Sequence, residues 1–299
     1  MFLRCIYVFP LLSLLWILSG CMPNYFLLHP LKQVPGIYRE SGFFDEEGLR
    51  VHWLARYPDR QEPLPAVLVH PDRGSIAEDM EGICLALAER GYFAVAAHYQ
   101  RLEKLEEENP LIPWRSGKDA VAALDHLRNH PRIDPKRIGL LGFSKGAILS
   151  LQIASESPAI QAVVAYYPLA DFEEWVDVEQ YRFPKSLLFR WVRNKLVKEI
   201  GATDYEEARS KFRKISPINL VERIQAPVLL IHGEKDHTFP VEQTQRLCQG
   251  LKEAKKSCKL MIVPEVGHVF NFLDAEQGRI AWAQTVAFFE RHLFPKSSP

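Results

Sequence analysis

The chain has 299 residues, of which 47% are hydrophobic and 25% are charged. These fractions are typical of a folded globular protein, and they exclude a disordered chain, a collagen-like chain and a polytopic membrane protein. The 37 basic residues balance the 37 acidic ones, so we expect no net field that attracts nucleic acid or an anionic membrane. Overall charge therefore assigns no partner.

The N-terminus differs in character from the rest of the chain. Residues 1–20 contain one charge, Arg4, and then an apolar run that ends at Leu18. This run is shorter than the ~20 residues that cross a bilayer, and its length is typical of a secretory signal peptide. It ends in Leu-Ser-Gly before Cys21, which resembles the lipobox of bacterial lipoproteins. We expect a signal peptide over residues 1–20 and a lipid on Cys21, hence a membrane-anchored lipoprotein of the cell envelope, on the periplasmic side or at the surface. An uncleaved anchor and plain secretion are the alternatives.

Three cysteines remain after this segment, namely Cys84, Cys248 and Cys258. Three cysteines cannot all pair within one chain, and their spacing does not match that of metal ligands. Cys248 and Cys258 can form a bridge in an exported protein, or both can be buried thiols. We expect no metal and no cofactor.

The remaining chain alternates short apolar runs with helical patterns. Residues 21–36 contain three prolines and no periodicity, so we expect them to form a tether. We expect one domain over residues 37–296. Strands are expected at Arg39–Phe44, Val51–Tyr57, Ala66–His70, Phe93–His98, Arg137–Phe143, Ile160–Tyr167, Pro227–Ile231 and Lys259–Val263. Helices are expected at Ala77–Arg90, Gly117–His130, Lys145–Ser155, Val241–Ala254 and Arg279–Leu293. This alternation predicts an α/β protein with a mostly parallel sheet of eight strands flanked by helices.

The interval Leu169–Arg223 interrupts the alternation. It contains helical patterns over Lys185–Ile200 and Tyr205–Lys214. A bare loop of this length between two strands is uncommon, so we expect a helical cap insertion over about residues 169–223. Its aromatic residues, such as Trp191, either pack the cap onto the domain or line a substrate pocket.

A nucleophile motif follows the strand that ends at Phe143. The sequence Gly142-Phe143-Ser144-Lys145-Gly146 has the G-x-S-x-G pattern between a strand and a helix, where a serine sits in a sharp turn with its hydroxyl exposed. A serine hydroxyl needs a base to remove its proton, and the base needs an acid to hold its tautomer.

Candidates for the base and the acid follow two later strands. Asp236 comes after the strand Pro227–Ile231, and His268 comes after the strand Lys259–Val263. The carboxyl ends of strands in a doubly wound sheet are where catalytic groups gather. His237 is an alternative base and Asp171 an alternative acid.

These motifs together resemble the dienelactone hydrolase-like branch of the α/β-hydrolase superfamily, which is akin to the catalytic domains of prolyl oligopeptidases. The matching pieces are His70–Gly74, the Ser144 motif, Gly233–Asp236 and Gly267-His268. The resemblance implies that Ser144 is the nucleophile, His268 the general base and Asp236 its orienting acid. Dienelactone hydrolase itself has cysteine at the nucleophile position, so the serine here favours ordinary ester or related acyl bonds.

The oxyanion of an acyl-transfer reaction needs backbone donors that are fixed in advance. One expected donor is the N–H of Lys145, because it begins the helix after the serine. The resemblance implies that the second is the N–H of Asp72, with Arg73 as the alternative.

The expected function is that of a serine hydrolase that cleaves carboxylic esters through an acyl-enzyme and takes a small acyl substrate. The alternatives are a peptidase-like amide hydrolase and a catalytically silent binding lipoprotein on the same fold.

Overall fold

The computed structural model describes residues 33–46, 49–101, 121, 124–126 and 128–294. The strands are β1 (Ile37–Glu46), β2 (Leu49–Pro58), β3 (Leu64–His70), β4 (Phe93–Arg101), β5 (Ile133–Phe143), β6 (Ile160–Tyr166), β7 (Val228–Gly233) and β8 (Cys258–Val263). The helices are η1 (Glu78–Met80), α2 (Glu81–Ala88), α4 (Lys145–Glu156), α5 (Phe172–Trp175), η3 (Val178–Gln180), α6 (Lys185–Glu199), α7 (Tyr205–Ile215), η4 (Pro217–Asn219), α8 (Val241–Glu253), α9 (Phe270–Leu273) and α10 (Ala275–Leu293).

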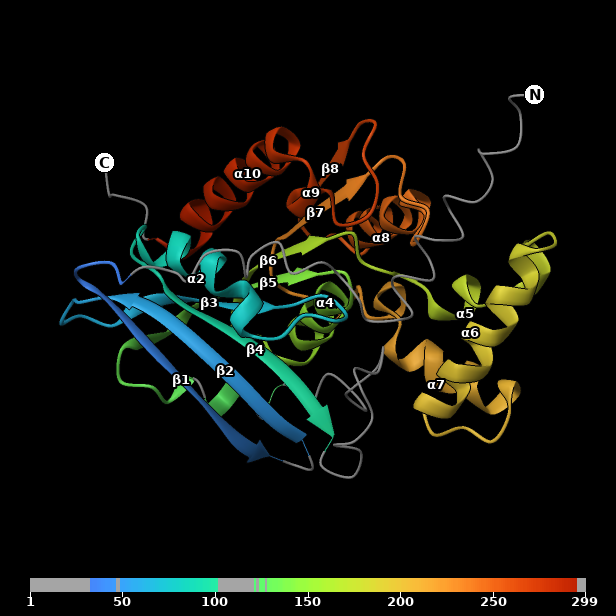
Figure 1. Cartoon of the computed structure of the whole chain (residues 1–299), viewed down its shortest axis with the longest axis horizontal. Helices are drawn as coiled ribbons and strands as arrows, with labels where there is room; N and C mark the ends of the chain where they lie inside the picture. Colours follow the sequence, from blue (N-terminus) through green and yellow to red (C-terminus); the bar gives the residue numbers. More distant parts are fainter. Residues whose placement is uncertain (1–32, 47–48, 102–120, 122–123, 127, 295–299) are drawn as a thin grey trace.

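The strands form one sheet of eight in the order β1-β2-β4-β3-β5-β6-β7-β8 (Figure 1). β1 pairs with β2 and β2 with β4 in antiparallel fashion, and every later pair is parallel. Parallel strands are covered on both faces, and all residues of β3 are buried accordingly. The predicted mostly parallel, eight-stranded α/β architecture is confirmed.

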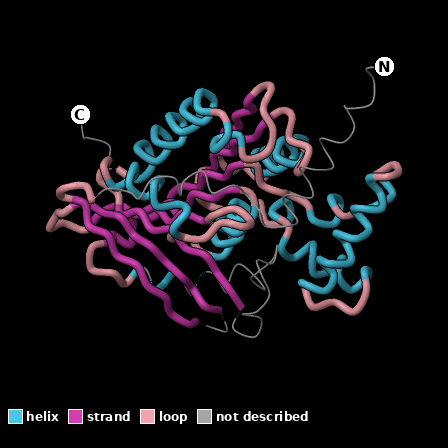
Figure 2. The backbone as a smooth tube through the Cα atoms, viewed as in Figure 1, coloured by secondary structure: helices cyan, strands magenta, loops and turns pink. Residues whose placement is uncertain are grey.

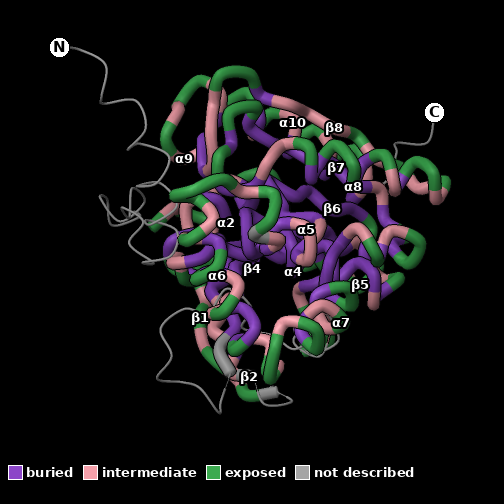
Figure 3. The backbone as a smooth tube through the Cα atoms, turned by 90° about the vertical axis from the view of Figure 1, so that its right-hand side faces the viewer, coloured by how far each residue is buried: buried purple, intermediate pink, exposed green. Residues whose placement is uncertain are grey.

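Helices cover both faces of the sheet, because successive residues of a strand point to opposite sides. In β3, Leu68 belongs to the hydrophobic core that also contains Leu149 of α4 and Leu247 of α8. Its neighbour Val67 belongs to a second core with Leu87 of α2 and Phe289 of α10. Figure 3 shows this buried interior at the centre of the molecule, inside a largely exposed outer layer.

The segment between β6 and β7 carries α5, η3, α6, α7 and η4, and it lies beside the sheet rather than on either face (Figure 2). We refer to residues 169–223 as the cap. Trp175 joins the cap to the domain, because its indole N–H donates to the carbonyl of Thr238 at 2.9 Å. Glu174 accepts a hydrogen bond of 2.8 Å from the Gln243 side chain and also pairs with Arg246. These contacts attach the cap to the start of α8.

Several element boundaries differ from those predicted. The helix expected from Ala77 starts as the 3₁₀ turn η1 and becomes α-helical at Glu81. The strand expected from Arg137 begins at Ile133, because Ile133 pairs with Leu64 of β3. The last helix begins at Ala275, since the carboxylate of Asp274 caps it by accepting the N–H groups of Glu276 and Gln277.

The two possibilities for Cys248 and Cys258 are resolved in favour of a disulfide, which joins α8 to β8 with a Cα–Cα distance of 5.7 Å. Cys84 is a buried free thiol. The expected signal peptide, Cys21, most of the tether and half of the helix expected at Gly117–His130 lie outside the described residues. Within the described parts, none of the helices has the length and apolar character needed to span a membrane.

Candidate active site

Ser144 lies in the turn between β5 and α4. Its backbone has φ of 50° and ψ of −114°, a strained conformation for a residue with a side chain. A Cβ on Gly142 would lie 2.3 Å from the carbonyl oxygen of Gly146, and a Cβ on Gly146 would lie 2.2 Å from that of His70. Gly142 is therefore required for the turn to close, and Gly146 is required for the turn to pack against the end of β3.

Ser144, His268 and Asp236 form one line of hydrogen bonds. Nε2 of His268 lies 2.9 Å from Oγ of Ser144, and its Nδ1 lies 2.6 Å from Oδ2 of Asp236. The three residues are 92 and 32 positions apart in the chain, from 236 − 144 and 268 − 236, and each follows the carboxyl end of a different strand. This arrangement can transfer a proton from the hydroxyl to the imidazole.

The Asp236 carboxylate is buried and accepts hydrogen bonds on both oxygens. Oδ1 accepts the backbone N–H groups of Thr238 at 2.8 Å and Phe239 at 3.0 Å. Oδ2 faces His268 and also lies 3.1 Å from Nε2 of His232. Burial acts to raise the pKa of Asp236, but the charges and hydrogen bonds of His268 and His232 outweigh it and hold the pKa well below its usual range. Asp236 is therefore ionised.

His232 is a member of this network that the sequence analysis missed. It is fully buried near the end of β7, and its Nδ1 lies 2.6 Å from Oγ1 of Thr244. Its Nε2 faces two acceptors, the Phe239 carbonyl at 2.9 Å and the Asp236 carboxylate, so Nε2 must carry the hydrogen. The only signal in the sequence is a histidine four positions before Asp236, at the end of an apolar strand.

Two aromatic rings hold the imidazole of His268. The ring centroid of Tyr167 lies 4.5 Å from it, and the ring of Phe239 lies at 5.2 Å with its plane nearly perpendicular. The Tyr167 hydroxyl donates to Oδ1 of Asn271 at 2.7 Å. Tyr167 also has a positive φ of 41°, so the chain turns sharply there as it leaves β6. Sequence reasoning missed Tyr167 as well.

The loop after β3 lies against the start of α4, as the close approach of Gly146 to His70 requires. Asp72 and Arg73 in this loop are both buried. Burial raises the pKa of the Asp72 carboxyl, and a hydrogen bond from Ser75 with the nearby charges of His268 and Lys145 lowers it in part. Lys145 is the first residue of α4, where N–H groups have no acceptor within the helix. The two predicted oxyanion donors thus lie in neighbouring segments.

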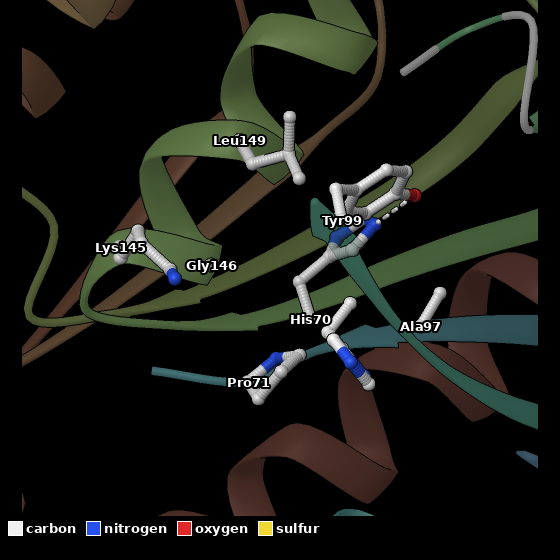
Figure 4. A pocket seen from close by; sticks show the side chains of 8 residues that line it. His70, Pro71, Ala97, Tyr99, Lys145, Gly146 and Leu149 are labelled. Atoms are coloured by element: carbon white, nitrogen blue, oxygen red, sulfur yellow. Dashed lines mark hydrogen bonds between the residues drawn. The ribbon is translucent and has the colours of Figure 1, made fainter. Parts of the chain in front are cut away.

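A small pocket lies behind the nucleophile turn, and Figure 4 shows the side chains of Lys145, His70 and Tyr99 around it. Nδ1 of His70 lies 2.8 Å from the Ser150 hydroxyl, and its Nε2 lies 3.0 Å from the Tyr99 hydroxyl. Burial lowers the pKa of His70 to about 3, so His70 is neutral. This histidine holds α4 to β3 and belongs to the core.

Lys145 carries a buried charge at this pocket. Burial and the charge of Arg73 lower its pKa, the charges of Asp72 and Glu199 raise it, and the net result is a pKa of about 8. Glu199 lies at the end of α6 and is itself buried. Charges from the β3 loop, the nucleophile turn and the cap therefore meet beside Ser144.

The rival candidates lie elsewhere. Asp171 accepts the N–H of Glu174 at 3.2 Å and so caps α5. His237 is exposed. Within the described ranges, His, Cys, Asp and Glu side chains do not gather in any group of three that could hold a metal ion.

Comparisons with known proteins agree with this architecture. The model of the dienelactone hydrolase family matches residues 52–293. A protein of Yersinia pestis provisionally named as a carboxymethylenebutenolidase is 24% identical, over 89% of this chain and 92% of that protein. The uncharacterized peptidase YtmA of Bacillus subtilis is 30% identical, over 75% of this chain and 83% of its own length. Acetyl xylan esterase 1 from Thermoanaerobacterium sp. JW/SL YS485 shares the fold, with a TM-score of 0.66, 19% identity and coverage of 88% of this chain and 86% of the esterase.

Proposed function

Because the chain belongs to the dienelactone hydrolase family, we propose that it is a serine hydrolase that cleaves carboxylic esters through an acyl-enzyme. The observation that carries the proposal is the hydrogen-bonded line from Ser144 through His268 to Asp236 at a nucleophile turn. In this proposal Ser144 is the nucleophile, His268 the general base and Asp236 the orienting acid.

The proposed reaction has two steps. In the first step, Nε2 of His268 takes the proton of Ser144 while Oγ forms a bond to the ester carbonyl carbon. Backbone N–H groups of Lys145 and Asp72 stabilise the resulting oxyanion. The imidazolium then protonates the alkoxide leaving group as the C–O bond breaks. In the second step, water attacks the acyl-enzyme with His268 again as the base, which releases the acid and restores Ser144.

A peptidase activity is the second candidate, and its support is the 30% identity to the uncharacterized peptidase YtmA. The same groups can cleave an amide, but His268 must then protonate a poorer leaving group. The match to the dienelactone hydrolase family supports the ester, because a dienelactone is a cyclic ester. Comparing p-nitrophenyl esters with aminoacyl p-nitroanilides distinguishes the two activities, and faster turnover of the anilides would overturn the ester assignment.

The proposal places the enzyme in the cell envelope, anchored by a lipid on Cys21. The apolar run before Cys21 supports export, and the Cys248–Cys258 disulfide supports an oxidising compartment. Labelling cells with a palmitate analogue should mark the protein and leave a Cys21→Ser variant unmarked. An unmarked wild-type protein in the membrane fraction would indicate an uncleaved anchor instead.

The nucleophile is tested with a fluorophosphonate probe, which bonds to an activated serine hydroxyl. The wild type should be labelled and should hydrolyse p-nitrophenyl esters. Ser144→Ala should be neither labelled nor active, and its thermal unfolding temperature should equal that of the wild type. Ser210 is exposed on α7, so Ser210→Ala is the matched control and should behave as the wild type. Equal labelling of Ser144→Ala would remove Ser144 from its proposed role.

The acid is tested by comparing Asp236→Asn with Asp171→Asn. Asparagine at 236 favours the wrong imidazole tautomer, and the corresponding change in the serine protease triad costs on the order of 10⁴ in kcat. Asp171→Asn should keep most of the esterase rate, because Asp171 caps a short helix. Loss of activity in Asp171→Asn together with a nearly normal rate in Asp236→Asn would assign the acid to the segment after β6.

A further inference from the structure

Large apolar side chains are exposed on the outer face of the cap. Phe183, Leu187 and Trp191 are 79%, 55% and 51% exposed. Leu187 and Trp191 both lie on α6, where residues four apart share a face. Phe183 lies outside the helix, directly before its N-cap residue Pro184. We call Phe183, Leu187 and Trp191 the outer stripe.

The outer stripe is not the face by which α6 packs onto the protein. That contact uses Phe189, Val192 and Leu196, all of which are buried. These buried side chains are therefore the ones that pack α6 onto the protein, and the outer stripe takes no part in that contact. Trp191, which was expected either to pack the cap or to line a pocket, lies in the outer stripe.

Basic residues flank the outer stripe along the chain. Residues 182–199 contain six basic side chains and one acidic side chain, Glu199, and Glu199 is buried. Arg182, Lys185, Arg190 and Lys198 are exposed. The ammonium group of Lys195 lies 5.7 Å from the centroid of the Trp191 ring. Residues 182–199 thus carry an excess of positive charge that the near-zero net charge of the whole chain does not reveal.

We propose that the outer face of α6 docks on an anionic lipid surface. Helices that lie in the plane of a membrane present Trp, Phe and Leu to the acyl chains and Lys or Arg to the headgroups, and basic residues add attraction to anionic lipids. The outer stripe and its exposed arginines and lysines match both requirements. Acidic headgroups complement the charge, and the acyl chains cover the apolar side chains.

The test uses the full chain with phosphatidylcholine vesicles whose acyl chains are brominated, with and without phosphatidylglycerol. Bromine quenches a tryptophan only on close approach, so the fluorescence difference between the wild type and Trp191→Phe reports the position of Trp191. Sedimentation of the vesicles verifies that the protein is bound in every sample. We expect Trp191 to be quenched on vesicles containing phosphatidylglycerol, with weaker quenching when that lipid is absent or the salt concentration is raised.

Variants separate the apolar and charged contributions. Phe183→Ser with Leu187→Ser should abolish most of the Trp191 quenching, and Arg182→Gln with Arg190→Gln should reduce it on anionic vesicles. Phe43 is 64% exposed on β1, so Phe43→Ser is the matched control and should leave the quenching unchanged. Hydrolysis of a soluble p-nitrophenyl ester should be the same in all these variants, which verifies their folding.

Two outcomes would overturn the proposal. One is an unquenched Trp191 in protein that sediments with the vesicles, because the stripe would then face water on a bound molecule. The other is self-association in solution that shields Trp191 without lipid and is abolished by the Phe183 and Leu187 changes, because the stripe would then contact a second copy of the chain.

Discussion

The Asp236 carboxylate has several hydrogen-bond partners in addition to His268. Besides His268, it accepts two backbone N–H groups and faces the N–H of His232. A carboxylate held from several sides keeps its position and its charge, and the imidazole that it orients stays aligned with Ser144. If Asp236 is the orienting acid, as proposed, His232 is expected to be a positioning residue that acts through Asp236.

Replacing His232 should impair turnover more than substrate binding. We expect His232→Ala to lower kcat by about 10- to 100-fold, since a hydrogen bond to a charged group contributes roughly 1.5–3 kcal/mol, and to leave KM within a few-fold of the wild type. His232→Gln, which keeps an N–H donor, should recover part of the loss. A rise in KM without a fall in kcat, or no rescue by glutamine, would mean that His232 only fills space.

Lys145 should affect stability in a defined pH window. Its pKa in the folded protein is about 8, below the ~10.4 of an unfolded chain. Between these values the unfolded chain binds a proton that the folded protein does not, so the contribution of Lys145 to the free energy of unfolding rises with pH. As the pH rises from 7 to 10.5, the free energy of unfolding of the wild type, measured with denaturant, should increase by on the order of 3 kcal/mol relative to that of Lys145→Met. A constant difference would show that the ammonium group is not desolvated.

The three residues of the proposed triad, Ser144, Asp236 and His268, could be picked out in the sequence because each follows the end of a predicted strand within a motif. His232 and Tyr167 carry no such mark. A histidine or tyrosine at the end of an apolar strand is compatible with ordinary core packing, and only the fold places these two against the triad.

At the scale of elements, apolar runs predicted the strands, because strands inside the sheet are buried on both faces. Periodic patterns predicted the helices, because a helix buries one stripe of its surface. Boundaries moved where a contact distant in the chain decides them, as when Leu64 pairs with Ile133 and extends β5. The cap shows a further limit. From the sequence, the aromatic residues of the cap, Phe189 and Trp191 among them, had the same two possible roles. In the structure α6 buries Phe189 and exposes Trp191, because only one side of the helix meets the domain.

At the scale of the molecule, the disulfide connects the outermost strand β8 to α8, which lies beside β7 and β8. β8 has a single strand neighbour, so this bridge reinforces an edge of the sheet that also leads to His268. The cysteines are separated by 10 positions, and closing so short a loop stabilises a protein by roughly 2–3 kcal/mol.

The bridge should therefore be measurable in unfolding experiments. Cys248→Ser combined with Cys258→Ser should lower the free energy of unfolding by roughly 2–3 kcal/mol while ester hydrolysis at low temperature persists. A thiol reductant should lower the stability of the wild type to the level of the double variant and leave the double variant unchanged. A reductant that affects both proteins equally would show that the two sulfurs are not bonded.

The position of the cap in the chain has a consequence for how this molecule can change. Ser144 precedes the cap, whereas Asp236 and His268 follow it, yet β6 and β7 are directly hydrogen-bonded from Val163↔Val228 to Tyr166↔Ile231. Backbone pairing in the sheet, rather than the covalent path through the cap, keeps Ser144 in register with Asp236 and His268. Evolution can thus lengthen, shorten or replace the segment beside the sheet, while the hydrogen-bonded line from Ser144 through His268 to Asp236 stays intact.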